Sequence, residues 1–369
     1  MAPLIKQLAV TPGVQSVVCT TGQHRSMLDQ VMGLFDLHAD HDLDVMVANQ
    51  TLNGLSRRLL ERLDPVLDTF KPDRILVHGD TTTAMVSALA AFHRGIAVGH
   101  VEAGLRTGNL RQPWPEEMNR RVVDVVSDLM FAPTAQSRAN LLAENLGGRS
   151  FVTGNTVIDA LGLMANRLAT DQALRDSVDA RLPALDLARR MLLVTGHRRE
   201  NFGDGFESIC GALADLAQRD DIEIVYPVHL NPNVQAPVHA ALGRLPRVHL
   251  IEPLDYLGFI RLMQRAHVIL TDSGGVQEEA PSLGKPVLVM RELTERPEAL
   301  AAGVVRLVGT SRTRIVDTVN ALFDDPVLWR SFSQVCNPYG DGRASERIVA
   351  ALLGEEVAEF VPITYAAES

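Results

Sequence analysis

The sequence is poor in cysteine and in long apolar runs, and each shortage excludes a class of protein. Its three cysteines, Cys19, Cys210 and Cys336, lie far apart and form no CxxC pair, so they indicate neither a disulfide framework nor a zinc knuckle. No apolar run approaches the ~20 residues of a membrane span. The start, MAPLIKQL, lacks the apolar core and cleavage site of a signal peptide. We therefore expect a soluble, cytoplasmic protein without a membrane partner.

Basic residues and cofactor motifs are also scarce. Lys and Arg number 35 against 45 Asp and Glu, a net charge of −10, and they form no block that would bind nucleic acid or an anionic membrane. There is no GxGxxG fingerprint, Walker loop or HExxH motif, and the 11 histidines are scattered. We expect a small ligand, no nicotinamide or ATP cofactor, and no metal.

What the chain does contain is a regular alternation of strands and helices. A length of 369 residues with 46% hydrophobic content favours two domains with full cores. Short β-branched runs alternate with amphipathic stretches, which predicts an α/β fold of parallel sheets covered by helices on both faces. The expected strands are 14–20, 74–79, 96–101, 191–196, 222–228, 267–272 and 286–290.

The alternation loosens after FVTGN (151–155), where a long polar helical region (156–188) precedes the next strong strand. We place the domain boundary there. The expected domains are 1–155 and 156–343, and the last helix, about 344–360, is expected to pack back on the first domain.

The stretch DSGGVQEE combines glycines with acids at the start of a helix. Ser273, Gly274 and Gly275 would present free backbone N–H groups to a phosphate. Glu279, one turn deeper, could accept both hydroxyls of a ribose, while Glu278 could face elsewhere. An ordinary capped helix with acids near its positive end is an equally good interpretation of these residues alone.

Three carboxylates follow separate apolar segments. Asp80, Glu102 and Glu116 could meet at one mouth, because ligands of parallel sheets lie beyond the carboxyl ends of the strands. Carboxylates close together acquire different pKa values and can serve as acid and base. Asp80 could instead cap the helix beginning at TTTAMVSAL, and Glu116 could be a first-turn acid after Pro115.

His197 ends the strand MLLVTG and precedes Arg198 and Arg199. A single histidine is more often a structural residue, but the neighbouring cations favour contact with a phosphate.

The chain resembles the non-hydrolysing UDP-N-acetylglucosamine 2-epimerases over almost its whole length, with its motifs in the same order. The motifs that carry the resemblance are HGDTTT, GHVEAGLRTG, PWPEEMNR, TGNTVIDAL, TGHRREN, YPVHLNPNV, DSGGVQEEAPSLGKPVLVMR, TERPEA and NPYGDG. It implies a GT-B fold, with two Rossmann-like doubly wound domains, an interdomain cleft and usually a homodimer. It also implies reversible conversion of UDP-GlcNAc to UDP-ManNAc for bacterial surface polysaccharides.

The resemblance assigns residues to this chemistry. Without a nicotinamide site, inversion at C2 favours elimination of UDP to a 2-acetamidoglucal and re-addition, which needs proton transfer at both faces of C2. The matching positions are Asp80, Glu102, Glu116 and His197 for catalysis, and Ser273, Gly274, Gly275, Glu279, Arg296 and Phe259 for UDP. A second, activating UDP-GlcNAc would contact Gln23, His24, Arg198 and His229. Each of these four could also be a plain loop or cap residue, and Phe259 an ordinary helix core residue.

The chain departs from the family at its start. Family members begin with a strand and a loop like FGTRPEAIK before the MAPL helix, whereas this sequence begins at that helix. A missing central strand would leave its neighbours unpaired. We hypothesise that Met1 is an internal methionine of a longer protein. Expression of an upstream-extended form tests this, since equal stability and activity of both forms would refute it.

Three other functions stay open. A hydrolysing 2-epimerase would release free ManNAc, although PWPEEMNR and TGHRREN favour the non-hydrolysing branch. A GT-B glycosyltransferase of the retaining type often carries two glutamates eight positions apart, but Pro286 and Val287 stand eight positions beyond Glu278 and Glu279. A catalytically weak UDP-sugar binding protein would bind without turnover.

Overall fold

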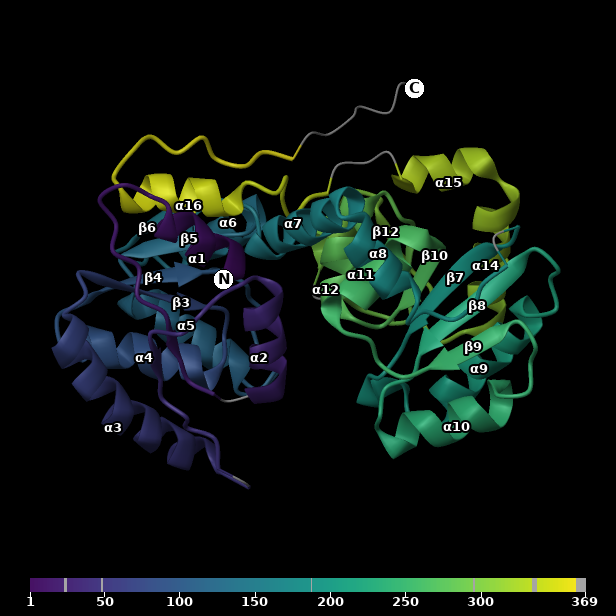
Figure 1. Ribbon diagram of the computed structural model, residues 1–369, viewed down its shortest axis with the longest axis horizontal. Helices are drawn as coiled ribbons and strands as arrows, with labels where there is room; N and C mark the ends of the chain where they lie inside the picture. Colours follow the sequence, from purple (N-terminus) through teal and green to yellow (C-terminus); the bar gives the residue numbers. More distant parts are fainter. Residues whose placement is uncertain (23–24, 48, 187, 295, 334–336, 363–369) are drawn as a thin grey trace. The chain divides into compact units, whose positions relative to one another are not determined.

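The protein divides into two compact units, Met1–Ala160 with Gly340–Val361, and Leu161–Tyr339. The structure is a computed structural model that describes residues 1–22, 25–47, 49–186, 188–294, 296–333 and 337–362. In each unit parallel strands alternate with helices (Figure 1). The expected α/β class with two Rossmann-like units is therefore confirmed.

The first unit contains a four-stranded parallel sheet of order β3-β4-β5-β6 and a separate parallel pair, β1-β2. Only the last two residues of the strand expected at 14–20 pair with another strand. Val17 before them is 37% exposed, so this segment lacks the burial that stabilises a strand. The strands are β1 (Cys19–Thr20), β2 (His41–Asp42), β3 (Arg74–His78), β4 (Ala97–Val101), β5 (Leu129–Ala132) and β6 (Arg149–Val152).

Helices cover the sheet of the first unit, and α1 lies against α16. Leu4, Leu8 and Ile348 from these two helices share one buried cluster with Phe131 of β5. Asp159 fixes the start of α16, because its carboxylate accepts the N–H groups of Ala344 and Ser345 at 3.0 and 2.7 Å. The helices are α1 (Ala2–Ala9), α2 (Arg25–Leu34), α3 (Leu52–Phe70), α4 (Thr82–His93), α5 (Glu116–Val126), α6 (Ala135–Ala143), α16 (Ala344–Leu352) and the start of α7 (Thr156–Thr170), which continues into the second unit.

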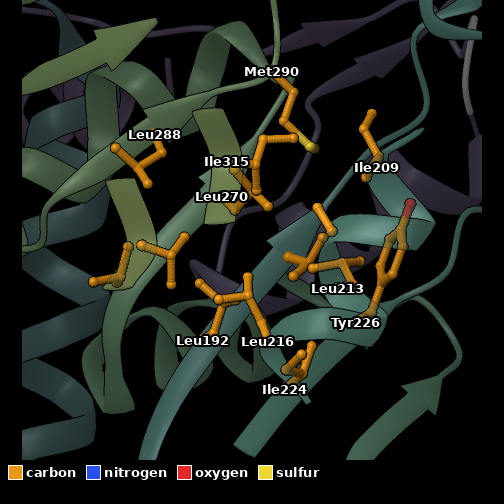
Figure 2. Packing of buried hydrophobic residues seen from close by; sticks show 14 of the residues in the cluster. Leu192, Ile209, Leu213, Leu216, Ile224, Tyr226, Leu270, Leu288, Met290 and Ile315 are labelled. Atoms are coloured by element: carbon orange, nitrogen blue, oxygen red, sulfur yellow. The ribbon is translucent and has the colours of Figure 1, made fainter. Parts of the chain in front are cut away.

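The second unit is built on a six-stranded parallel sheet of order β12-β11-β10-β7-β8-β9. Its central strands are buried on both faces, which explains why they are continuous apolar runs in the sequence. Figure 2 shows Leu192, Leu270 and Leu288 of three strands packed with Leu213 and Ile315. The strands are β7 (Arg190–Thr195), β8 (Ile222–Pro227), β9 (Val248–Ile251), β10 (Ala266–Thr271), β11 (Val287–Val289) and β12 (Val305–Leu307).

The neighbouring strands β7 and β10 bring two loops to one edge of this sheet. Thr195 is paired with Thr271 at their carboxyl ends, and the two hydroxyl oxygens lie 2.6 Å apart. The segments 196–201 and 272–275 therefore leave the sheet side by side. The helices of this unit are α8 (Gln172–Asp179), η1 (Arg199–Asn201), α9 (Asp204–Leu216), α10 (Pro232–Leu242), α11 (Tyr256–Arg265), α12 (Gly274–Glu279), η2 (Ala280–Leu283), α13 (Pro297–Ala301), α14 (Arg312–Asp324) and α15 (Pro326–Ser333).

Within the described residues, every helix is too short or too polar to cross a membrane.

Candidate active site

In the first unit, the ends of β3 and β4 bring an imidazole and a carboxylate together. His78 ends β3, and its Nε2 lies 3.7 Å from Oε2 of Glu102, which follows β4. Gly79 lies against the same carboxylate, since a Cβ added to it would stand 3.2 Å from Glu102 Oε2. Gly79 also has φ +66°, a backbone conformation that favours glycine. Asp80 follows Gly79 directly in the sequence. Asp80 and Glu102, two of the three expected carboxylates, therefore both lie next to this glycine.

Glu102 itself has an unusual backbone. Its φ is +69°, in the left-handed region that costs a non-glycine residue roughly 1 kcal/mol. The conformation is held because the N–H groups of Glu102 and Ala103 both donate to Phe131 O, at 3.1 and 3.0 Å. Asn155, after β6, donates from Nδ2 to Glu102 Oε1 at 3.2 Å. Strain retained at a carboxylate with polar neighbours is typical of a functional position.

Asp80 is fixed by an ion pair. Arg120 of α5 donates to Asp80 Oδ2 from Nε at 3.1 Å and from its terminal nitrogen, and its other terminal nitrogen lies 3.1 Å from Glu117 Oε2. The cap of α4 is Thr81, whose hydroxyl accepts the N–H of Ala84 at 3.1 Å, so Asp80 is not the helix cap. Asp80 is thus anchored to the helix that begins with the third expected carboxylate, Glu116.

Glu116 and Glu117 have different surroundings although they are adjacent. Glu117 is fully buried and accepts the N–H groups of Thr107 and Gly108 at 3.1 and 3.2 Å, which fixes the preceding loop. Glu116 is half-buried at the first position of α5. Glu117 therefore fixes the loop that precedes α5, whereas the carboxylate of Glu116 has access to solvent.

In the second unit, one buried carboxylate organises the loop after β7. Asp272 Oδ2 accepts the backbone N–H groups of His197 and Arg198, both at 2.9 Å, and the side chain of Asn201 at 3.3 Å. Its other oxygen lies 3.3 Å from His197 Nδ1. Asp272 is fully buried, whereas the His197 side chain is 41% exposed. Burial lowers the pKa of His197, and the carboxylate of Asp272 opposes this shift.

Two guanidinium groups converge over the start of α12. A Cβ added to Gly274 would lie 3.9 Å from a terminal nitrogen of Arg198 and 4.0 Å from one of Arg296. Arg296 forms an ion pair with Glu278, and Nε of Arg198 is buried without a hydrogen-bond partner among the described residues. Cations at a glycine-containing helix start suit an anion such as a diphosphate.

One detail of the expected phosphate contact is wrong. The N–H of Ser273 is not free, because it donates to the Thr271 hydroxyl at 3.0 Å. Thr271 ends β10, and its side chain reaches the first turn after the strand. The backbone donors of this segment are therefore those of Gly274 and Gly275, at the first positions of α12, where N–H groups have no acceptor within the helix.

Glu279 lies at the other end of α12 and is buried. Tyr256 of α11 donates its hydroxyl to Glu279 Oε1 at 2.6 Å. Burial raises the pKa of Glu279 to about 7, an effect that Tyr256 opposes and the nearby Glu278 reinforces. Phe259 stands one turn after Tyr256 on α11 and is half-buried. Its helix therefore contacts Glu279 through Tyr256.

The residues expected at an activator site are only partly described. His229, after β8, stacks on His197 with ring centroids 5.4 Å apart, and the charge of Arg198 acts on His197. Gln23 and His24 lie outside the described residues.

Sequence reasoning did not identify Asp272, Asn155, Arg120 or Tyr256. The first two follow the apolar runs of β10 and β6, so the rule that directs attention to polar residues at strand ends could have found them. Arg120 and Tyr256 lie in helices, and only the tertiary contacts with Asp80 and Glu279 give them a role.

Among the described residues, no three His, Cys, Asp or Glu side chains are grouped as a metal site would require.

The chain is similar to known UDP-N-acetylglucosamine 2-epimerases over almost its whole length. The family profile for UDP-N-acetylglucosamine 2-epimerase matches residues 6–353. The UDP-N-acetylglucosamine 2-epimerase of Escherichia coli K12 is 55% identical over 359 residues, which cover 97% of this chain and 96% of the relative.

Solved structures agree with this assignment. The UDP-GlcNAc 2-epimerase of Neisseria meningitidis, solved bound to UDP-GlcNAc, is 48% identical with a TM-score of 0.88 and 96% of both chains covered. That of Methanocaldococcus jannaschii, solved with UDP-GlcNAc and UDP, is 31% identical with a TM-score of 0.77, covering 96% of this chain and 95% of that one. The chain belongs to the UDP-N-acetylglucosamine 2-epimerase family.

Proposed function

We propose that the protein interconverts UDP-GlcNAc and UDP-ManNAc by non-hydrolysing epimerisation at C2. The observation that supports this most directly is the arrangement of Glu102, with its strained backbone, against His78 and the Gly79–Asp80 segment. Membership of the family and the ligands of its solved members support the same substrate.

The chemistry requires two proton-transfer groups and a bound leaving group. C2 of the sugar is not adjacent to a carbonyl, so its proton is not acidic enough for direct inversion. A carboxylate removes the C2 proton, the electrons of that bond form the C1–C2 double bond, and the C1–O bond breaks with its electrons going to UDP. Anti elimination gives 2-acetamidoglucal. UDP then adds back to C1 while C2 receives a proton on the opposite face.

Asp80, Glu102 and Glu116 are the proposed proton-transfer groups. Arg120 anchors Asp80, and Asn155 holds Glu102 while leaving its second oxygen toward His78. Two carboxylates whose oxygens are fixed by different partners can differ in basicity, which suits one as base and another as acid.

The second unit is proposed to bind UDP. Arg198 and Arg296, with the N–H groups of Gly274 and Gly275 and the Ser273 hydroxyl, would contact the diphosphate and stabilise the charge that develops as it leaves. His197, held by Asp272, would contact the same oxygens. Glu279 would accept the ribose hydroxyls, and Phe259 would lie near the uracil.

Four finer expectations belong to the same proposal. The enzyme would act as a cytoplasmic homodimer, a second UDP-GlcNAc would activate it through Arg198 and His229 together with Gln23 and His24, and the product would supply bacterial surface polysaccharides. The stacking of His229 on His197 supports a link between activator and leaving-group contacts.

Proton NMR in D₂O with UDP-GlcNAc tests the proposal. UDP-ManNAc with deuterium at C2 is the expected product, and Glu102→Gln should abolish its formation while UDP binding persists. Free ManNAc with UDP would instead indicate a hydrolysing enzyme, and binding without turnover in every form would refute the catalytic assignment.

A further inference from the structure

We propose that His100 is a buried imidazolium that positions the Gly79–Asp80 segment for proton transfer. His100 stands in β4, two residues before Glu102, and its two ring nitrogens lie against Asp124 and Gly79. The role is that of a positioning residue, and its importance for turnover rests on the proposed function.

Both ring nitrogens of His100 face hydrogen-bond acceptors. Nδ1 lies 2.6 Å from Asp124 Oδ1, and Nε2 lies 2.9 Å from the carbonyl oxygen of Gly79. His100 and Asp124 are both fully buried. A neutral imidazole carries one N–H and one lone pair, so it could satisfy only one of two acceptors. Either the ring carries two protons or the Asp124 carboxyl carries one.

The charges around Asp124 decide between these alternatives. Arg106 lies 2.8 Å from Asp124 Oδ2 and donates to both oxygens of Glu144 at 2.8 Å. A guanidinium beside Asp124 favours the carboxylate, and the second proton then belongs to the ring. His100, Asp124, Arg106 and Glu144 form one chain of charged contacts, and Arg121 Nε also lies 3.4 Å from Glu144 Oε1. His78, on the neighbouring strand β3, is the further titratable group that interacts with His100 electrostatically.

The imidazolium acts on the backbone next to the candidate site. Gly79 is fixed on one side by its own N–H, which donates to Val101 O at 2.9 Å, and on the other by its carbonyl, which accepts from His100. That carbonyl belongs to the peptide that joins Gly79 to Asp80. The orientation of this peptide therefore determines the position of the Asp80 side chain and the distance between Gly79 and Glu102. A displacement of 1 Å in such a group can cost about a hundredfold in rate.

Two near-isosteric variants separate the two ring contacts. His100→Gln places an amide N–H where Nε2 stands and keeps the donor to Gly79, whereas His100→Asn keeps a donor to Asp124 and loses the one to Gly79. We expect kcat to fall less than about tenfold in His100→Gln and about a hundredfold in His100→Asn. KM and UDP affinity should stay unchanged in both. Equal losses in the two variants would overturn the positioning role.

The protonation state is tested in the wild-type protein without any turnover. After ¹⁵N-histidine labelling, the ring signals missing in His100→Gln identify His100, and two N–H correlations from that ring are expected. One N–H with one unprotonated nitrogen would overturn the imidazolium assignment. A wild-type protein that shows both N–H signals but no epimerisation would refute the proposed function alone, and the ring measurement stands if His100→Asn does not fold.

Discussion

Asp272 holds His197 at both its backbone and its ring: one carboxylate oxygen accepts the His197 N–H at 2.9 Å, and the other lies 3.3 Å from Nδ1. The same carboxylate also accepts the N–H of Arg198. One buried group therefore sets the position of an imidazole and of Arg198, the residue that caps the following 3₁₀ turn. In the sequence these residues are 75 positions apart, and the pairing of β7 with β10 brings them together.

Asp272→Asn should reduce turnover about a hundredfold, because the amide nitrogen cannot accept the N–H groups and displaces the ring. The measurement is kcat by the D₂O exchange assay, with UDP-GlcNAc binding followed by calorimetry. Asp220→Asn is the matched control, since the Asp220 side chain is 95% exposed and pairs only at the surface with Arg247. Wild-type turnover in Asp272→Asn would show that the carboxylate does not organise this site.

Affinity for UDP-GlcNAc should rise with pH through the pKa of Glu279, which burial raises to about 7 from an ordinary value of 4.5. Ribose hydroxyls donate to the ionised carboxylate, so binding favours the deprotonated form, and affinity is low below the pKa and full above it. We expect at least about a tenfold increase between about pH 5.5 and about pH 8. Calorimetric titration with UDP-GlcNAc measures it, because the diphosphate diester does not itself titrate in this range.

Glu279→Gln removes the titrating group and should bind weakly with a flat pH profile. An equally steep profile in this variant would assign the titration to another residue. Tyr256→Phe should lower affinity and move the pH dependence to higher pH, because the hydroxyl that it removes donates to the carboxylate at 2.6 Å and opposes the rise in the pKa of Glu279.

The sequence predicted β3, β4, β7, β8, β10 and β11, but it missed β5, whose four residues are all buried, and extended the run at 14–20 too far. β7 and β10 are buried on both faces, so they are apolar runs with clear ends. The run at 14–20 contains three valines, but only Cys19 and Thr20 pair with another strand. Composition indicates strand propensity, whereas pairing depends on neighbours that a local pattern does not contain.

The candidate site shows the same division. The rule for strand ends identified Asp80, Glu102 and His197 as positions of interest, and the structure places each at a carboxyl end of a strand. The rule for strand ends could not show that the Ser273 N–H donates to the Thr271 hydroxyl. Nor could it show that Asp80 pairs with Arg120, which stands 40 positions later in the sequence. These facts depend on rotamers and tertiary contacts, which no short motif encodes.

Arg120→Met should destabilise the first unit by about 3 kcal/mol, because it leaves the carboxylate of Glu117 buried without its cation and releases Asp80. Urea denaturation monitored by circular dichroism measures the change. Arg57→Met is the control: Arg57 pairs with Glu61 on the surface of α3, where both side chains are more than half exposed. The control should change stability by less than about 1 kcal/mol. Equal effects of the two substitutions would contradict the buried role of Arg120.

Stability should also fall on acidification through His267, whose ring stacks on Trp329 with centroids 5.1 Å apart and meets Phe323 edge-on at 4.9 Å. Burial, with a contribution from the positive charge of Arg190, lowers the pKa of His267 to about 4 from 6.5. The unfolded chain therefore takes up a proton first as the pH falls. The stabilisation is complete above pH 6.5 and is lost progressively toward pH 4.

Since the ring is only half-buried, we expect this loss to be about 1–2 kcal/mol, less than the full shift would give. His267→Phe keeps an aromatic ring between Trp329 and Phe323 and removes the titrating group. Urea denaturation at about pH 7.5 and about pH 4.5 gives the unfolding free energy of both proteins. Between these two pH values the wild type should lose about 1–2 kcal/mol more than the variant. Other groups titrate equally in both proteins and cancel, so a difference that does not vary with pH would show that His267 titrates alike in the folded and unfolded chains.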